Sequence, residues 1–214
     1  MKTRPFMVVW GFLLLVHMAG ISQELKPIAL PAPVTEGGMP LMQALKERKT
    51  TREYTSAKLS LQTLSDLLWA ANGVNRPAEK KRTAPSAMNR QEISVYAALE
   101  EGLFLYDAFA NQLQPVLAED IREATGRQDF VKIVPVNLIY VAAVSTDSTI
   151  AESDRIFYPA TDTGFISQNV YLYCASFGLA TVVRGWMDKP ALAKAMKLRP
   201  EQKIVLAQTV GYPK

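Results

Sequence analysis

The strongest constraint on this chain is an apolar, β-branched run near its middle, VNLIYVAAV at residues 136–144. A strand with one solvated face alternates apolar and polar residues, and this run does not alternate. We therefore expect a strand that is buried on both faces. Such a strand needs other parts of the chain above and below its sheet.

The flanking sequence supplies helices and further strands. Ser60 is a good N-cap, apolar residues recur at helical spacing from Leu61 to Ala71, and Gly73 is a natural stop. The other predicted helices cover residues 40–48, 114–124, 163–177 and 190–198; the other predicted strands cover 93–97, 103–106, 179–183 and 204–210. Residues 75–91 are expected to be a loop. The sum is a mixed α/β layered domain with no internal repeat.

The first 22 residues have the order of a secretory signal peptide. Lys2 and Arg4 precede an apolar run from Phe6 to Val16, and small or weakly polar residues follow as far as Ser22. The alternative is a transmembrane anchor, which needs about 20 apolar residues, and this run is shorter. No Cys follows the run, which excludes a lipid-modified Cys at the new N-terminus. We expect cleavage near Ser22 and an exported protein, periplasmic or secreted.

The rest of the chain divides into an arm and one domain. Residues 23–39 are rich in Pro and Gly and have no hydrophobic period, so an extended N-terminal arm is expected. Residues 40–214 are long enough for one domain with a substantial core. Removal of residues 1–22 takes away two basic residues and no acidic one, so the formal charge falls from +4 to +2. That charge is too mild to indicate a nucleic-acid partner.

Two absences narrow the chemistry. The only histidine, His17, lies in the predicted signal peptide, which removes Ser-His-Asp and Cys-His catalysis and most zinc sites from the mature chain. The single cysteine, Cys174, cannot form an internal disulfide and lies in the apolar run 170–177, which favours a buried, inert thiol. We predict no metal site. An enzyme without His or a reactive Cys is expected to take its chemistry from a cofactor.

Three segments are candidate ligand sites, and each has a plainer interpretation. Residues 48–52, RKTTR, supply cations and a hydroxyl, but a solvated helix end has the same composition. Residues 82–91, RTAPSAMNRQ, hold short hydrogen-bonding side chains, which alone indicate a turn. Residues 178–188, GLATVVRGWMD, end a buried strand in a Gly-containing turn, which is also a strand-to-helix connection with Asp188 as the cap. No GxGxxG or GxxxxGK[ST] motif supports a Rossmann or P-loop nucleotide site.

Taken in this order, the three segments resemble the FMN-dependent nitroreductase family over nearly the whole mature chain. The resemblance implies an α+β fold: a nitroreductase-like layered α/β/α domain with a mixed, mainly antiparallel central sheet, in a homodimer. It implies FMN as cofactor and hydride transfer through flavin N5 to a small organic acceptor such as a nitroaromatic or a quinone. No side chain is then catalytic, because the flavin carries the redox step.

The resemblance also assigns site residues. RKTTR is similar to the family's phosphate motif, which places Arg48, Lys49 and Thr50 at the FMN phosphate and ribityl end and Arg52 near flavin N1 and the C2 carbonyl. PSAMNRQ resembles a loop that reaches the flavin from the other subunit, which assigns Pro85, Ser86, Ala87 and Asn89. The resemblance also assigns Gln128 as an amide that contacts the flavin ring, and it places Arg184 and Gly185 beside the pyrimidine edge.

The chain also departs from the family pattern. Gln91 is followed by Glu92-Ile93-Ser94, where many members have Pro-Trp. Many members extend beyond Gly-Tyr-Pro into an arm that embraces the partner; here Lys214 is the candidate replacement for one phosphate contact, and residues 23–39 are a candidate substitute arm.

The motifs LLWAANG, RTAPSA, SQNVYL and GLATVVRG resemble the branch that contains azoline-oxidising dehydrogenases of peptide-tailoring clusters. Export argues against a nicotinamide donor, which is scarce outside the cytoplasm. Two alternatives therefore stay open. One is a non-catalytic exported module that binds flavin or another ligand; the other is a dehydrogenase that acts on peptide-derived heterocycles.

Overall fold

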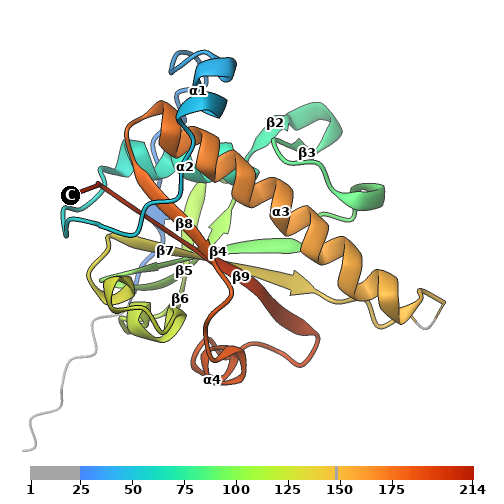
Figure 1. The fold of residues 1–214 in the computed structure, drawn as a ribbon. Helices are drawn as coiled ribbons and strands as arrows, with labels where there is room; N and C mark the ends of the chain where they lie inside the picture. The colour runs from blue at the N-terminus through green and yellow to red at the C-terminus, as the bar shows by residue number, and fades with distance from the viewer. Residues whose placement is uncertain (1–24, 148) are drawn as a thin grey trace, which may run out of the picture.

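The structure is a computed structural model that describes residues 25–147 and 149–214. The predicted signal peptide lies outside the described residues. The described chain builds one central sheet with helices over both faces (Figure 1). The helices are α1 (Leu41–Glu47), α2 (Leu61–Asn72), α3 (Glu152–Ser176) and α4 (Lys189–Ala195), and short 3-10 helices are η1 (Pro77–Glu79), η2 (Ala87–Asn89), η3 (Arg122–Thr125) and η4 (Asp129–Lys132). The strands are β1 (Ile28–Ala29), β2 (Val74–Arg76), β3 (Lys81–Arg82), β4 (Ile93–Leu99), β5 (Gly102–Asp107), β6 (Gln112–Leu117), β7 (Val136–Ala143), β8 (Ala180–Arg184) and β9 (Gln202–Gly211).

The seven-stranded sheet has the order β1-β6-β5-β4-β7-β9-β8. Strand β7 is its most heavily paired member, with β4 on one side and β9 on the other. All of β7 except its last residue is buried, which confirms the prediction of a strand covered on both faces. Every pairing between the described strands is antiparallel, so a mainly antiparallel sheet is confirmed. Strand β8 forms one edge of the sheet, and β1 forms the other.

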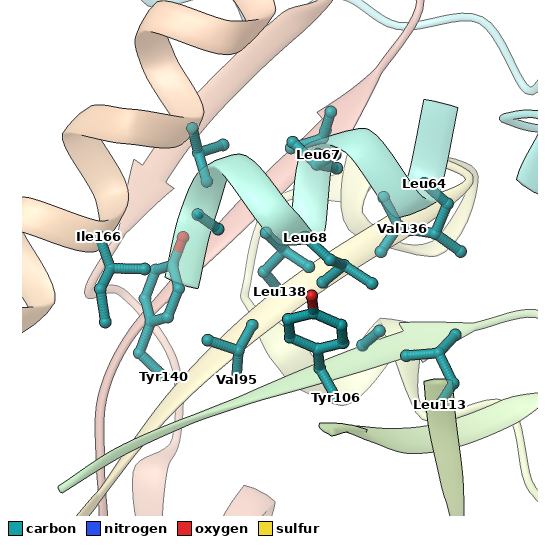
Figure 2. Packing of buried hydrophobic residues seen from close by; sticks show 14 of the residues in the cluster. Leu64, Leu67, Leu68, Val95, Tyr106, Leu113, Val136, Leu138, Tyr140 and Ile166 are labelled. Atoms are coloured by element: carbon teal, nitrogen blue, oxygen red, sulfur yellow. The ribbon is translucent and has the colours of Figure 1, made fainter. Parts of the chain in front are cut away.

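Alternate residues of β7 pack into two different cores, which is the periodicity of a strand. Leu138 and Tyr140 contact side chains of α2 and α3, including Leu67 and Leu68 (Figure 2). Ile139, on the opposite face, belongs to a second cluster with apolar residues of α4. The domain is therefore an α/β/α sandwich, as predicted.

Local signals place two helices as expected. The Ser60 side chain accepts a hydrogen bond from the Thr63 amide, 3.0 Å away, at the start of α2, and Gly73 ends that helix. Asp188 caps α4 in the same way, accepting from the Ala191 amide at 3.0 Å. Among the described residues, no helix has both the length and the apolar character needed to cross a bilayer.

Three predicted boundaries are wrong. Residues 112–117 form strand β6 instead of the start of a helix at 114–124, because a turn returns the chain antiparallel to β5; in that turn Asp107 accepts from the Phe109 and Ala110 amides. Helix α3 begins at Glu152 rather than near Thr163, and it holds Pro159 in its interior. The expected loop at 75–91 contains the small β2–β3 ribbon and two 3-10 turns.

The described part of the predicted arm packs on its own chain. The carbonyl of Pro31 accepts from the Ser65 hydroxyl at 2.6 Å, and the Val34 amide donates to Asp66 at 2.8 Å, so the segment lies along α2. The Met39 amide then donates to the Ser176 hydroxyl, 2.6 Å away, at the end of α3. These contacts place the segment against its own α2 and α3.

Candidate functional site

A cleft of about 650 Å³ opens where residues 49–53 pass between the end of α3, the start of β8 and the C-terminal residues. We call it the first cleft. Its polar lining comprises Gln43, Glu47, Lys49, Thr50, Thr51, Arg52, Glu53, Tyr171, Thr181 and Lys214. The structure thus brings Lys214 to Lys49, Thr50 and Arg52, from which it is far apart in sequence.

Backbone pairing holds residues 51–55 in this position. The Thr51 amide donates to the Thr181 carbonyl of β8 at 3.0 Å, and the Thr55 amide donates to the Tyr212 carbonyl at 2.9 Å. Tyr54, which is 1% exposed, forms a bridge with Pro213 and donates from its hydroxyl to the Thr51 carbonyl at 2.6 Å. Burial raises the pKa of Tyr54 well above its usual value, so this hydroxyl stays a donor.

Tyr171 of α3 connects the RKTTR segment with the sheet edge. Its hydroxyl lies 3.1 Å from the Thr50 hydroxyl and accepts from the Val183 amide of β8 at 3.0 Å. The guanidinium of Arg48 lies over its ring, 5.3 Å from the centroid, so Arg48 flanks the first cleft. Sequence reasoning missed Tyr171; the available signal was a tyrosine inside an apolar helical run, because buried Tyr hydroxyls need a partner.

The charges of the first cleft suit an anion. Lys49, Arg52 and Lys214 face it with two glutamates, and none of the salt bridges between described residues uses these three cations. A phosphate dianion binds best to cations and hydroxyls together, because charge-assisted hydrogen bonds are the strong ones. The residues present therefore fit the phosphate of FMN.

Arg184, at the end of β8, turns its side chain away from this cleft and is 4% exposed. It donates to the Thr125 carbonyl at 2.8 Å, to Asn137 at 2.9 Å and to the Thr209 hydroxyl at 3.0 Å. Gln128 accepts a longer bond from it at 3.5 Å. Burial lowers its pKa to about 10, so it stays charged at neutral pH. The Arg184 side chain is therefore not part of the first cleft, and Gln128 contacts Arg184 rather than that cleft.

The loop with Pro85, Ser86, Ala87 and Asn89 lies elsewhere in the same chain. The Ala87 amide donates to the buried carboxylate of Asp162 in α3 at 3.0 and 3.2 Å. Asp162 and Tyr171 are nine residues apart in one helix, which separates them by roughly 13 Å along the axis and half a turn around it. Figure 1 shows the two segments on different sides of α3. One chain therefore does not bring this loop to the first cleft.

The same loop holds an unusual backbone. Met88, Asn89 and Gln91 have φ near +50°, a conformation that costs about 1 kcal/mol or more per non-Gly residue. The Ser86 hydroxyl accepts from the Gln91 amide at 2.8 Å, and this bond with the Asp162 contact fixes the shape. Asp162 is the second residue that sequence reasoning missed, because the predicted helix began one residue after it.

A second cavity, of about 580 Å³, lies beyond the other end of β8. Its walls are the first half of α3, the end of β7 and residues 203–206 of β9. A methyl group on Gly185 would lie 3.6 Å from Leu206 in this wall. Ala160, also in the wall, is eleven residues from Tyr171, so both are on one face of α3. The first cleft and the second cavity therefore share one side of the molecule, joined by about 13 Å of edge strand from Thr181 to Gly185.

Two observations on the part of the chain that the structure describes concern metal ligands and the thiol. No cluster of His, Cys, Asp and Glu there could hold a metal ion. Cys174 is free and 1% exposed, as predicted, and burial raises the pKa of its thiol far above the usual value.

Comparisons with known proteins identify what the chain is similar to. The model of the Nitroreductase family matches residues 45–212. A Methanocaldococcus jannaschii protein named as a nitroreductase is 32% identical over 170 residues, which cover 74% of this chain and 85% of that protein. The crystal structure of a Ralstonia eutropha JMP134 protein, also named as a nitroreductase, is 42% identical with a TM-score of 0.84, and the match covers 91% of this chain and 92% of that one.

Two more distant structures share the fold. The Escherichia coli microcin synthetase McbBCD complex with truncated pro-MccB17 matches at 19% identity and a TM-score of 0.68, covering 95% of this chain and 85% of that one. The NADPH:FMN oxidoreductase of Vibrio harveyi, complexed with NAD+, matches at 14% identity and a TM-score of 0.61, covering 81% and 69%. At these identities the likeness is one of fold.

Gly126 gives a test of the buried Arg184. A methyl group at this position would collide with Nη1 of Arg184 and lie 2.7 Å from Oε1 of Gln128. We expect Gly126→Ala to lower the free energy of unfolding of the flavin-free protein by about 2 kcal/mol or more, because a buried charge loses its hydrogen bonds. Gly185→Ala is the control and should change it by no more than about 0.5 kcal/mol. Urea denaturation measures both, and equal effects would contradict the described packing.

Proposed function

This chain belongs to the nitroreductase family, as its motifs predicted, and we propose that within that family it is an FMN-dependent enzyme that reduces a small organic acceptor such as a nitroaromatic or a quinone. Membership makes the chain a nitroreductase-type flavin oxidoreductase. The choice of FMN, the acceptor and the partner are the parts that we propose. When bound, FMN supplies the chemistry by accepting and donating a hydride at N5.

The observation that carries the proposal is the first cleft at one end of an edge strand, with three cations that no salt bridge between the described residues uses. Arg48, Lys49 and Thr50 would hold the phosphate and ribityl end, with Lys214 as a further phosphate ligand. Arg52 would stabilise negative charge on the flavin ring from the same cleft. The volume of the first cleft lies in the range of cofactor sites, roughly 300–1,000 Å³.

Gly185 and the side chain of Arg184 would act in different ways. The Gly185 backbone directly follows β8 at the edge of the sheet, where it can approach a planar ring. The Arg184 guanidinium donates to neutral acceptors, so among the described residues no carboxylate cancels its positive charge. A fixed cation near a dry site favours an electron-rich ligand without any reorganisation.

A non-catalytic binding module and a dehydrogenase of peptide-derived heterocycles stay as alternatives. The microcin synthetase complex supports the second through its fold alone. An absorption spectrum separates them: flavin bands that dithionite bleaches, followed by reoxidation with a quinone, are expected of the proposed enzyme. Bands that no acceptor restores would favour the binding module.

Arg48 tests the phosphate assignment. Hydrogen bonds to charged groups contribute roughly 1.5–3 kcal/mol, so Arg48→Ala should weaken FMN binding by roughly tenfold to a hundredfold or more. Arg48→Lys should lose part of that, because an ammonium group lacks the planar fork. Riboflavin has no phosphate, so its affinity should barely change. Titration of both flavins into deflavinated protein measures this, with Lys46→Ala in the last turn of α1 as the control. Equal FMN affinities would remove Arg48 from the site.

We also propose a homodimer in which the loop of each chain, Pro85 to Asn89, completes the partner's flavin site. The outer side of α3 carries two exposed apolar residues, Phe157 and Phe165, at 61% and 43% exposure, which are the kind of side chains that an interface covers. One chain also keeps this loop away from its own first cleft.

The dimer is expected to dissociate and to lose FMN affinity together when Phe157 and Phe165 are both replaced by Glu, because two charges would be buried in an apolar contact. Phe109→Glu is the matched control, since this side chain is 59% exposed at the β5–β6 turn. Light scattering and FMN titration measure the two effects. A monomer that still binds FMN tightly would contradict the shared site.

Export is proposed on the sequence pattern alone. The chain recovered from a native-like host is expected to begin near Gln23 and to be found in the periplasm or the medium. Intact-mass analysis gives the answer, and a full-length species in the membrane fraction would contradict cleavage.

A further inference from the structure

The second cavity exists because β8 is shorter than its neighbour. Strand β8 ends at Arg184, which pairs with Ala207, so residues 203–206 of β9 have no strand on that side. The chain then turns through Gly185 into α4, and the first half of α3 forms the opposite wall. The result is a hollow of about 580 Å³, the size of a site for one small organic molecule.

The walls of this cavity are apolar and its polar groups are mostly cations. The apolar lining consists of Ala142, Val144, Ile156, Pro159, Ala160, Ile204, Val205 and Leu206. Arg155, Lys189 and Lys203 also line it, with Glu152 as the single acid. None of the salt bridges between described residues includes these three cations.

The side chain of Arg155 has one hydrogen-bond donor that the described residues leave unpaired. Its Nε is buried and has no hydrogen-bond partner among the described residues. A buried donor without a partner is costly, and a carboxylate is the acceptor that guanidinium groups bind best. A neutral carbonyl could also accept from this donor, but only an anion would in addition form charge-assisted hydrogen bonds with the neighbouring ammonium groups.

We propose that the second cavity binds a small organic carboxylate with an aromatic or aliphatic body, and that this is the class of molecule on which the enzyme acts. The first half of the proposal stands on the cavity itself. The second half rests on the proposed function: Gly185 separates the cavity from the edge of β8, so an occupant would lie beside a flavin bound along that strand. The carboxylate would contact Arg155 and Lys203, and the body would pack on Leu206 and Ile156.

The test uses two probes of the same shape, 2-naphthoate and the neutral 2-naphthamide. Isothermal titration calorimetry on the flavin-free protein should give tighter binding of the naphthoate by about tenfold or more, as expected for at least one charge-assisted hydrogen bond. Equal or tighter binding of the naphthamide would overturn the proposal.

Matched variants locate the binding. Arg155→Gln and Lys203→Gln should each remove most of the preference for the naphthoate and leave naphthamide binding unchanged. Glu152→Gln should increase naphthoate affinity, because it removes the one acid from the lining. Lys194→Gln, on an exposed side of α4 outside the cavity, should change neither. A naphthoate affinity that stays the same in Arg155→Gln, Lys203→Gln and Glu152→Gln would overturn the assignment to this cavity.

A filling variant distinguishes a small molecule from a protein occupant. Ala160→Phe places a ring in the cavity and should abolish the binding of both probes while the protein stays folded by circular dichroism. If neither probe binds the wild type and Ala160→Phe dissociates a dimer in light scattering, a second copy of the chain occupies the cavity and the proposal is wrong.

The FMN-loaded protein separates this proposal from the proposed function. Naphthoate should shift the visible absorption of the bound flavin, and the shift should saturate at the affinity found by calorimetry. Naphthoate binding to a chain that does not take up FMN would support the anion cavity and overturn the proposed function. Naphthoate binding to loaded protein with an unchanged flavin spectrum would overturn the link to the substrate.

Discussion

Helix α3 is buried across one face of the sheet through Ile166, Val170 and Cys174, each at most 3% exposed, and every part of the candidate site depends on that contact. Burying an aliphatic side chain contributes about 1.5–3 kcal/mol, so these few residues fix the helix firmly. Once α3 is fixed, its next turns carry Tyr171 to the first cleft and Asp162 to the 85–89 loop. The apolar contact of α3 with the sheet thus fixes where Tyr171 and Asp162 lie relative to each other.

A second constraint is the surplus of positive charge along one side of the molecule. The first cleft, the buried Arg184 and the second cavity all present cations that salt bridges between the described residues do not use. An uncompensated buried charge is tolerated only with good hydrogen bonds, and Arg184 has them from Thr125, Asn137 and Thr209. This arrangement is the one that the proposed anionic ligands along β8 would require.

The sequence predicted those elements whose signals lie within a few neighbouring residues. The caps and period of α2 and the unalternating run of β7 placed those elements correctly, and RKTTR was predicted as one cation-rich segment before its partners were known. The start of α3 was missed because Pro159 usually marks a helix boundary, although here it lies inside. Tyr171 and the inward turn of the Arg184 side chain could not be predicted, because each depends on contacts with residues distant in sequence.

The departures from the family pattern have a structural counterpart in the loop. Gln91 does not lead into Pro-Trp; its amide and side chain instead brace the left-handed backbone, through Ser86, the Lys80 carbonyl and Asn89. The described residues of the N-terminal segment lie along their own α2, so that part is already committed within the chain. A dimer of this chain would therefore draw its association free energy from apolar surface such as the outer side of α3. The placement of the helices, rather than exchange of an arm, would then bring the loop to the partner's flavin site.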